Sequence, residues 1–355
     1  MGDRSGCSLV ELTVLDVLDS ITARRPRAYA RSAKALAGIE ERMGLGPRYA
    51  YEVLLDLARP WVVPIRTVVV AGDYGDRSFP TPADPEYTDC RPSHAGQLVL
   101  DAEAHRLAPL PVGLINGATY RGGTEPPLDP LRVLAALRRL LEDPRVADGE
   151  LIGIVGPPWS GTGCTVVGDL RALNRGRRVV LRERGQITIQ GTAVPEPPPA
   201  LPPPARNVQY YPYGGVASGE SFPAHLVIES LPARTVAPEV AQAIANRAVS
   251  LPSTDSHTGE TLGTTLPIAF VDDQSKGTEV RILVMLRPGS DPAAVRNQLA
   301  TIDGVSAEVP CAFPAPLAKL LRSWVNDHRS EDIAASLTEL QNAIRRDQQR
   351  ETRNR

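Results

Sequence analysis

This 355-residue sequence lacks the overall positive charge that is typical of nucleic-acid-binding proteins. It has 39 lysines and arginines against 41 aspartates and glutamates, which gives a formal net charge of -2 at pH 7. Any contact with a nucleic acid would therefore have to come from local basic clusters. Aromatic residues make up only 5% of the chain, whereas its 34 prolines and 29 glycines predict many turns.

The sequence is also poor in cysteine and in long apolar runs. Its four cysteines, Cys7, Cys90, Cys164 and Cys311, are far apart and fit no metal or redox spacing. The N-terminus MGDRSGCSLVEL has no apolar segment of a signal peptide, and runs such as WVVPIRTVVVAG are too short to span a bilayer. These features predict a cytoplasmic protein without membrane contact and without a metal site on this chain.

No familiar catalytic motif is present. The segment Gly156–Cys164, GPPWSGTGC, lacks the Lys-Ser/Thr pair of a phosphate-binding loop and is better explained as a glycine-rich turn. No H-E-x-x-H, G-x-S-x-G or dinucleotide-binding fingerprint occurs, and the five histidines are scattered. A small-molecule enzyme therefore has no supporting set of residues.

The first part of the chain predicts three helices followed by a strand and a loop. The helices are expected within residues 8–59, where apolar residues recur at helical spacing and Pro60 ends the third helix. IRTVVVAG (65–72) is a buried strand, and residues 72–85 form a turn-rich loop. These parts are typical of a winged helix-turn-helix domain.

Residues 98–190 predict alternating strands and helices. QLVLDAE (97–103), ELIGIVG (150–156) and CTVVG (164–168) are expected as strands, and 130–143 as a helix. RRVVLRERGQITIQG (177–191) is expected to form two strands.

The proline-rich run at 195–204, PEPPPALPPP, predicts polyproline II, either as a spacer or as a ligand for an SH3-type domain. We favour the spacer because strand patterns resume at HLVIESLP (225–232). A helix at 237–249 and a strand at 278–288 follow.

The last forty residues predict a helix. Ile333, Leu337, Leu340 and Ile344 have the 4-3-4 spacing of a coiled coil or a helical hairpin. The predicted fold is α+β: a winged helix-turn-helix domain (1–97), a tower-like α/β domain (98–316), and a C-terminal helix (317–355) that begins a truncated coiled coil.

A basic cluster lies at the start of the helix-turn-helix candidate. It consists of Arg24, Arg25, Arg27, Arg31 and Lys34. Such clusters are often only a solvated helix face, but here they could also neutralise DNA phosphates.

Several segments together resemble the DNA breakage-reunion (A) subunit of the type IIA topoisomerases, the gyrase A family. AYARSAKALAG (28–38) resembles its recognition helix, YEVLLDLARPW (51–61) its next helix, and GDYG (72–75) its wing turn. YTDCR (87–91) falls where the family has its tyrosine nucleophile. Further segments up to about residue 330 agree, and NRGRRVVLRERGQI (174–187) is the best local match.

The resemblance implies transient double-strand DNA breakage and religation through a phosphotyrosyl intermediate at Tyr87. It also implies a homodimer on duplex DNA, with ATP and Mg²⁺ bound by a gyrase B-like ATPase subunit. The DNA contacts implied by the resemblance and by the basic cluster are Arg24, Arg25, Arg27, Arg31, Ser32, Lys34, Arg91, Tyr120 and Arg121.

The sequence departs from the family where catalysis needs positive charge. Glu86 precedes the tyrosine where the family has arginine, and the family's His-Pro-His loop is here Met43–Leu45. The segment after Gly117 is shorter and lacks the isoleucine that intercalates between bases, so Tyr120 is at best a substitute. The alternative is therefore a catalytically degenerate paralogue in which Tyr87 is an ordinary loop tyrosine and the chain binds DNA or a protein partner.

Overall fold

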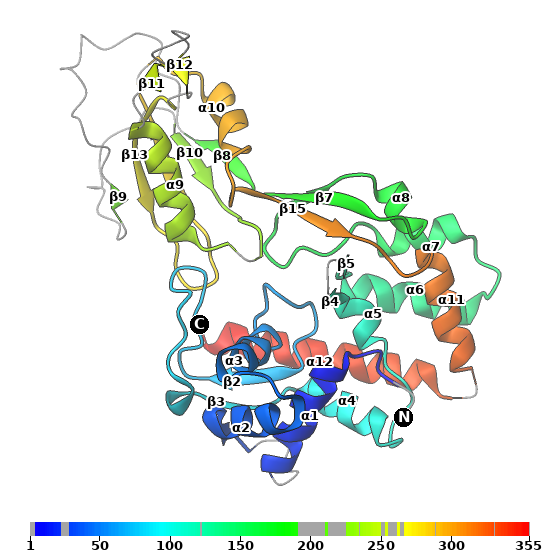
Figure 1. The fold of residues 1–355 in the computed structure, drawn as a ribbon. Coiled ribbons are helices and arrows are strands. Elements are labelled where there is room, and N and C mark those ends of the chain that lie inside the picture. Colours follow the sequence, from blue (N-terminus) through cyan, green and yellow to red (C-terminus); the bar gives the residue numbers. More distant parts are fainter. Residues whose placement is uncertain are drawn as a thin grey trace.

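The computed structural model describes most of the chain in atomic detail. The described residues are 4–22, 28–120, 123–190, 210–211, 225–233, 235–249, 253–254, 261–262, 266–287, 289–329 and 331–354. They form a mixed α+β fold, as the sequence predicted. Two lobes can be distinguished by their separate hydrophobic cores (Figure 1).

The first lobe begins with helices and a small sheet. Its opening elements are α1 (Leu9–Ile21), β1 (Ala30–Arg31), α2 (Ser32–Met43), α3 (Pro47–Asp56), β2 (Val68–Ala71), the 3-10 helix η1 (Pro85–Tyr87) and β3 (Asp89–Pro92). The strands form an antiparallel sheet in the order β1-β3-β2. α1, α2 and α3 lie within the range predicted as helical, and β2 lies within the predicted strand at 65–72. Ala30 and Arg31, expected within the second helix, instead form β1.

Local sequence signals explain where these helices begin and end. Ser8 and Glu11 form a reciprocal capping box that starts α1. Gly44 ends α2 in the left-handed conformation, with φ +65°, which glycine adopts without steric cost. Pro47 is at the first turn of α3, where its missing N–H is not needed. The turn between α2 and α3 is therefore encoded locally.

The remainder of the first lobe combines elements from both ends of the chain. These are α4 (His94–Glu103), α5 (Val112–Asn116), β4 (Ala118–Tyr120), β5 (Gly123–Glu125), α6 (Pro130–Glu142), α7 (Asp148–Val155), β6 (Thr165–Val167), α8 (Leu170–Asn174), β7 (Val179–Arg184), β15 (Ser306–Cys311), α11 (Leu317–Asp327) and α12 (Ile333–Asn354). The five strands form a sheet in the order β4-β5-β15-β7-β6. β15 thus returns from the second lobe to lie between β5 and β7.

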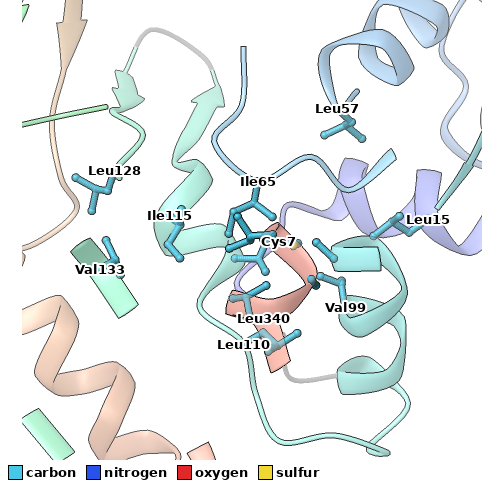
Figure 2. Close-up of a cluster of buried hydrophobic side chains, with 14 of the residues drawn as sticks. Cys7, Leu15, Leu57, Ile65, Val99, Leu110, Ile115, Leu128, Val133 and Leu340 are labelled. Atoms are coloured by element: carbon cyan, nitrogen blue, oxygen red, sulfur yellow. The ribbon is translucent and has the colours of Figure 1, made fainter. Parts of the chain in front are cut away.

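One continuous core holds the first lobe together. Figure 2 shows Leu340 of α12 among side chains from distant segments, including Cys7, Val99 and Leu110. Ile333, Leu337, Leu340 and Ile344, the predicted coiled-coil seam, are all buried, and α12 packs on α4 and α6. The seam is therefore already covered by the chain's own helices, and the buried cluster runs across the predicted boundaries at 97 and 316.

The second lobe is inserted between β7 and β15. It contains β8 (Ile187–Gln190), β9 (Tyr210–Tyr211), β10 (His225–Ile228), α9 (Ala237–Val249), β11 (Ser253–Thr254), β12 (Thr261–Leu262), β13 (Ile268–Asp273), β14 (Ile282–Leu286) and α10 (Pro292–Leu299). Its main sheet has the order β8-β10-β14-β13-β9, and α9 packs on β13. The predicted proline-rich segment at 195–204 lies outside the described residues.

Two predicted strands are helices in the structure. Residues 97–103 belong to α4, which Ser93 caps by accepting a hydrogen bond from the Gly96 N–H. Residues 150–155 belong to α7, which ends at Gly156. Both segments are short apolar runs, whose length and composition suit either element. The two strands predicted within 177–191 are present, but β7 pairs with β6 and β15, whereas β8 pairs with β10.

Among the residues that the structure describes, no helix combines the length and the apolar character needed to cross a membrane.

Candidate nucleic-acid interface

Tyr87 projects from a short turn at the start of β3. Its side chain is 76% exposed, although it is an aromatic residue. Its backbone is fixed, because the Tyr87 N–H donates to the Asp84 carbonyl at 2.8 Å and the Asp84 carboxylate accepts from the Glu86 N–H at 3.0 Å. The turn therefore presents the phenol to solvent from a defined backbone position.

The side chain of Tyr51 on α3 binds this turn through hydrogen bonds. Its hydroxyl donates to the Ala83 carbonyl at 3.0 Å and lies 3.1 Å from the Thr88 hydroxyl, so it holds both sides of the turn. Burial raises the pKa of Tyr51, which keeps the hydroxyl protonated as a donor. The Ser32 N–H at the start of α2 donates to the Thr88 carbonyl at 2.9 Å. Sequence reasoning missed Tyr51, because its partners come from a loop more than thirty residues away.

The charges nearest to Tyr87 in the chain are negative. Asp84 and Glu86 precede it and are exposed, and Asp89 follows it. Arg31, predicted as a phosphate contact, forms an ion pair with Asp89 at 3.3 Å, with about half of its side chain exposed. The segment around Tyr87 therefore carries three carboxylates, and Arg31 beside it is already paired.

The other predicted contacts are distributed between surface and interior. Lys34 is exposed on α2, whereas Ser32 is fully buried and its side chain faces the core. Arg91 is only 3% exposed; its guanidinium donates to the Pro92 carbonyl at 2.8 Å and stacks 5.0 Å from the Tyr29 ring. Tyr120 is the last residue of β4. Arg24, Arg25, Arg27 and Arg121 lie outside the described residues.

Arg91 lines a cleft of about 1020 Å³ between the small sheet, the tip of the β13–β14 hairpin and α12. Besides Arg91, the charged residues of its lining are Arg66, Lys276, Asp73, Asp76, Glu279 and Asp347. Acidic groups outnumber basic ones, so the cleft does not have the charge of a phosphate-binding groove.

The structure reveals a second basic region that sequence reasoning did not count among the DNA contacts. We call it the arginine surface; it consists of Arg171, Arg175, Arg177, Arg178, Arg182 and Arg184. All six are exposed. On β7, Val180, Arg182 and Arg184 point outward while Leu181 is buried, which is the alternation of a strand with one face in solvent.

The arginine surface carries little opposing charge. Residues 171–184 contain six arginines and a single acidic residue, Glu183, which is half-buried. Glu308 on the neighbouring β15 forms an ion pair with Arg182. This run of like charge was the signal that could have identified the surface from the sequence.

Within the described parts of the chain, no three His, Cys, Asp or Glu side chains converge in an arrangement that could hold a metal ion. The cysteines do not form a reactive site either, since all four are buried and unbridged. Burial raises the pKa of Cys90 and of Cys311 to about 11 in each case.

The chain matches no protein-family model, and none of the curated proteins matches it.

Proposed function

We propose that this chain is a duplex-DNA-binding subunit built on the plan of the type IIA topoisomerase A subunit, and that it acts as a homodimer. The observation that carries the proposal is the exposed Tyr87 on its fixed turn between β2 and β3. The element order helix, strand, two helices and two strands, with the sheet order β1-β3-β2, supports the proposal because it is the order expected of a winged helix-turn-helix. The same plan holds the tyrosine in the subunits that the sequence resembles.

Helix α3 is the recognition helix in this proposal. In a helix-turn-helix, the second helix of the pair enters the major groove with its N-terminal residues toward the bases. That helix is α3, and its Arg48 and Tyr49 are exposed at the N-terminal end. The resemblance to the gyrase A family implied instead that residues 28–38 have this role. In the structure they form β1 and the first turns of α2.

The arginine surface supplies phosphate contacts beyond the helix-turn-helix. Guanidinium groups bind phosphate in a bidentate manner, and each neutralised phosphate releases counterions. In Figure 1, α8 and β3 lie on opposite sides of the first lobe. A duplex that contacted both regions would therefore extend across the lobe.

Tyr87 is the nucleophile in the catalytic form of the proposal. Its phenolic oxygen attacks a DNA phosphorus, the bond from phosphorus to the 3′-oxygen breaks, and a 5′-phosphotyrosyl link forms. The phenolic proton passes to water and the 3′-oxygen takes up a proton; religation reverses these steps. A gyrase B-like partner subunit would hydrolyse ATP and hold Mg²⁺, which stabilises negative charge on the reacting phosphate.

A second candidate is a DNA-binding module without cleavage activity. The carboxylates of Asp84, Glu86 and Asp89 around Tyr87 favour it, because electrostatic stabilisation of the phosphorane requires positive charge. Loss of one such stabilising group typically lowers the rate by about 10²–10³-fold. In this candidate the arginine surface still binds duplex DNA.

Trapping the covalent intermediate distinguishes the two candidates. The full-length protein would be incubated with supercoiled DNA, Mg²⁺ and a candidate ATPase subunit, then quenched with detergent, and protein–DNA adducts would be counted. An adduct that Tyr87→Phe abolishes supports the nucleophile. DNA binding without an adduct supports the module. Absence of salt-dependent duplex binding contradicts both.

A further inference from the structure

The loop that leads to Tyr87 also reaches into the second lobe. Figure 1 shows the segment after β2 rising to meet the turn between β13 and β14. At its tip the Asp76 carboxylate accepts hydrogen bonds from the Ser78 and Phe79 N–H groups, both at 2.7 Å. Gly75 has φ +75°, and a Cβ there would lie 2.6 Å from the Pro80 carbonyl oxygen. The tip is therefore a compact turn that only glycine permits at this position.

Arg77 is the residue that this turn inserts into the second lobe. It is 2% exposed, and one guanidinium nitrogen donates to the carbonyls of Leu231 at 2.8 Å, Pro232 at 3.2 Å and Thr235 at 3.4 Å. A buried guanidinium that meets several carbonyls holds their segment in one geometry. The contact thus organises the connection between β10 and α9.

The backbone of Arg77 makes two further bonds to the same lobe. Its N–H donates to the Gly277 carbonyl at 3.1 Å, and its carbonyl accepts from the Ala237 N–H at 3.1 Å. Ala237 is the first residue of α9. The N–H groups in the first turn of a helix have no partner within the helix. Arg77 therefore joins the β13–β14 hairpin to the start of α9.

The strand connections form another attachment of the second lobe. There the Gly185 N–H donates to the Val305 carbonyl at 2.9 Å, between β7 and β8 on one side and before β15 on the other. The half-buried carboxylate of Glu183, near this connection, lies within electrostatic reach of Arg77. The lobe is thus held both through its covalent connections and through the Arg77 loop.

We propose that Arg77 is a positioning residue that locks the loop before Tyr87 to the second lobe and so fixes the orientation of the two lobes. The effect of this orientation on DNA binding rests on the proposed function. The orientation itself can be measured without DNA. Without the Arg77 side chain, the bonds to Leu231, Pro232 and Thr235 are lost while the backbone bonds to Gly277 and Ala237 remain. The loop then holds the second lobe less firmly, and the lobe moves relative to the first.

The test is a distance measurement in the full-length protein. Glu41→Cys on α2 and Asn297→Cys on α10, both exposed, would carry nitroxide labels, while the four native cysteines are buried. We expect one narrow distance distribution for this parent and a broad distribution for Arg77→Met. Arg106→Met, at an exposed arginine of the first lobe, is the matched control and should leave the distribution narrow. A narrow, unchanged distribution in Arg77→Met overturns the proposal.

Hydrogen exchange keeps the test decisive if Arg77→Met does not fold. In Arg77→Lys, whose ammonium still donates but lacks the planar guanidinium, we expect the Ala237 amide to exchange about tenfold faster. The Leu283 amide in the central strand β14 should keep its rate. Equal acceleration at both amides would mean that Arg77 only stabilises the whole fold, and would overturn the proposal.

Duplex binding by the same variants separates this proposal from the proposed function. If the parent binds no DNA but Arg77→Met still broadens the distances, Arg77 positions the lobes and the proposed function fails. If the parent binds DNA and the distances do not change, the proposed function stands and the role of Arg77 is wrong.

Discussion

The turn that carries Tyr87 and the arginine surface differ in charge and in how they are held. The turn has three carboxylates within a few residues and a backbone fixed by hydrogen bonds from α2 and α3. The arginine surface presents six exposed guanidinium groups on α8, β7 and the segment between them. A chain with a net charge of -2 thus separates an acidic turn from a surface rich in positive charge.

Under the proposed function, this difference predicts that DNA affinity and DNA cleavage are separable. Phosphate contacts contribute affinity in proportion to their number and need no fixed geometry. A nucleophile needs one oriented group and a stabilised transition state. Because the regions lie far apart on the first lobe, substitutions in one should leave the other unaffected (Figure 1).

The largest expected effect is a gain of cleavage in Glu86→Arg. Reversing this charge removes a repulsive carboxylate beside Tyr87 and adds a cation, so the yield of covalent adduct should rise by about 100-fold or more. Adduct trapping with detergent measures it. Glu339→Arg, at an exposed glutamate of α12, makes the same charge change elsewhere and should have no effect. An equal rise in both variants would mean that net charge alone controls the reaction.

The next effect is a loss of affinity when the arginine surface is neutralised. The triple variant Arg171→Ala, Arg175→Ala and Arg177→Ala should weaken duplex binding at low salt by about tenfold or more. The slope of the logarithm of the binding constant against the logarithm of the salt concentration should become less negative by about 2.7. Each of the three lost phosphate contacts contributes about 0.9 to this slope.

Fluorescence anisotropy over a series of salt concentrations measures this change. A second triple variant, Arg106→Ala, Arg296→Ala and Arg329→Ala, removes the same charge from exposed positions elsewhere. If the two triple variants weaken binding equally, the arginine surface has no special role in DNA binding.

A smaller effect is expected from removal of the support beneath the tyrosine turn. Tyr51→Phe leaves the Ala83 carbonyl and the Thr88 hydroxyl without their partner, which should lower the free energy of unfolding by about 1–2 kcal/mol. Urea denaturation measures this change. Tyr49→Phe, at an exposed tyrosine of the same helix, should leave it unaltered. A Tyr51→Phe protein as stable as the parent would show that the turn does not depend on α3.

The smallest effect on stability is expected for Tyr87→Phe itself. Because the side chain is 76% exposed, loss of its hydroxyl should change the free energy of unfolding by less than about 0.5 kcal/mol. Duplex affinity should also persist. A large loss of stability or of affinity would contradict the assignment of Tyr87 to chemistry alone.

The candidate site illustrates which features could be predicted in advance. The position of Tyr87 in a loop rich in proline followed from the sequence, but the strand β3 that comes after it was not predicted. The burial of Ser32 and Arg91 did not, because it depends on α2, β3 and Tyr29 packing together. The pairing of Arg31 with Asp89 likewise requires two segments that are distant in the chain to become neighbouring strands.

The sequence by itself determined the long amphipathic helices, the turn residues that end them and the local density of arginine, because these depend on neighbours within a few positions. Tertiary structure alone decided that residues 97–103 and 150–155 are helical, that β7 and β8 join different sheets, and that the C-terminal seam is buried within the chain. It also decided the place of Arg77, whose partners lie more than 150 residues away. Short apolar runs and single charged residues carry too little local information, so their conformation and burial depend on contacts that only the folded chain creates.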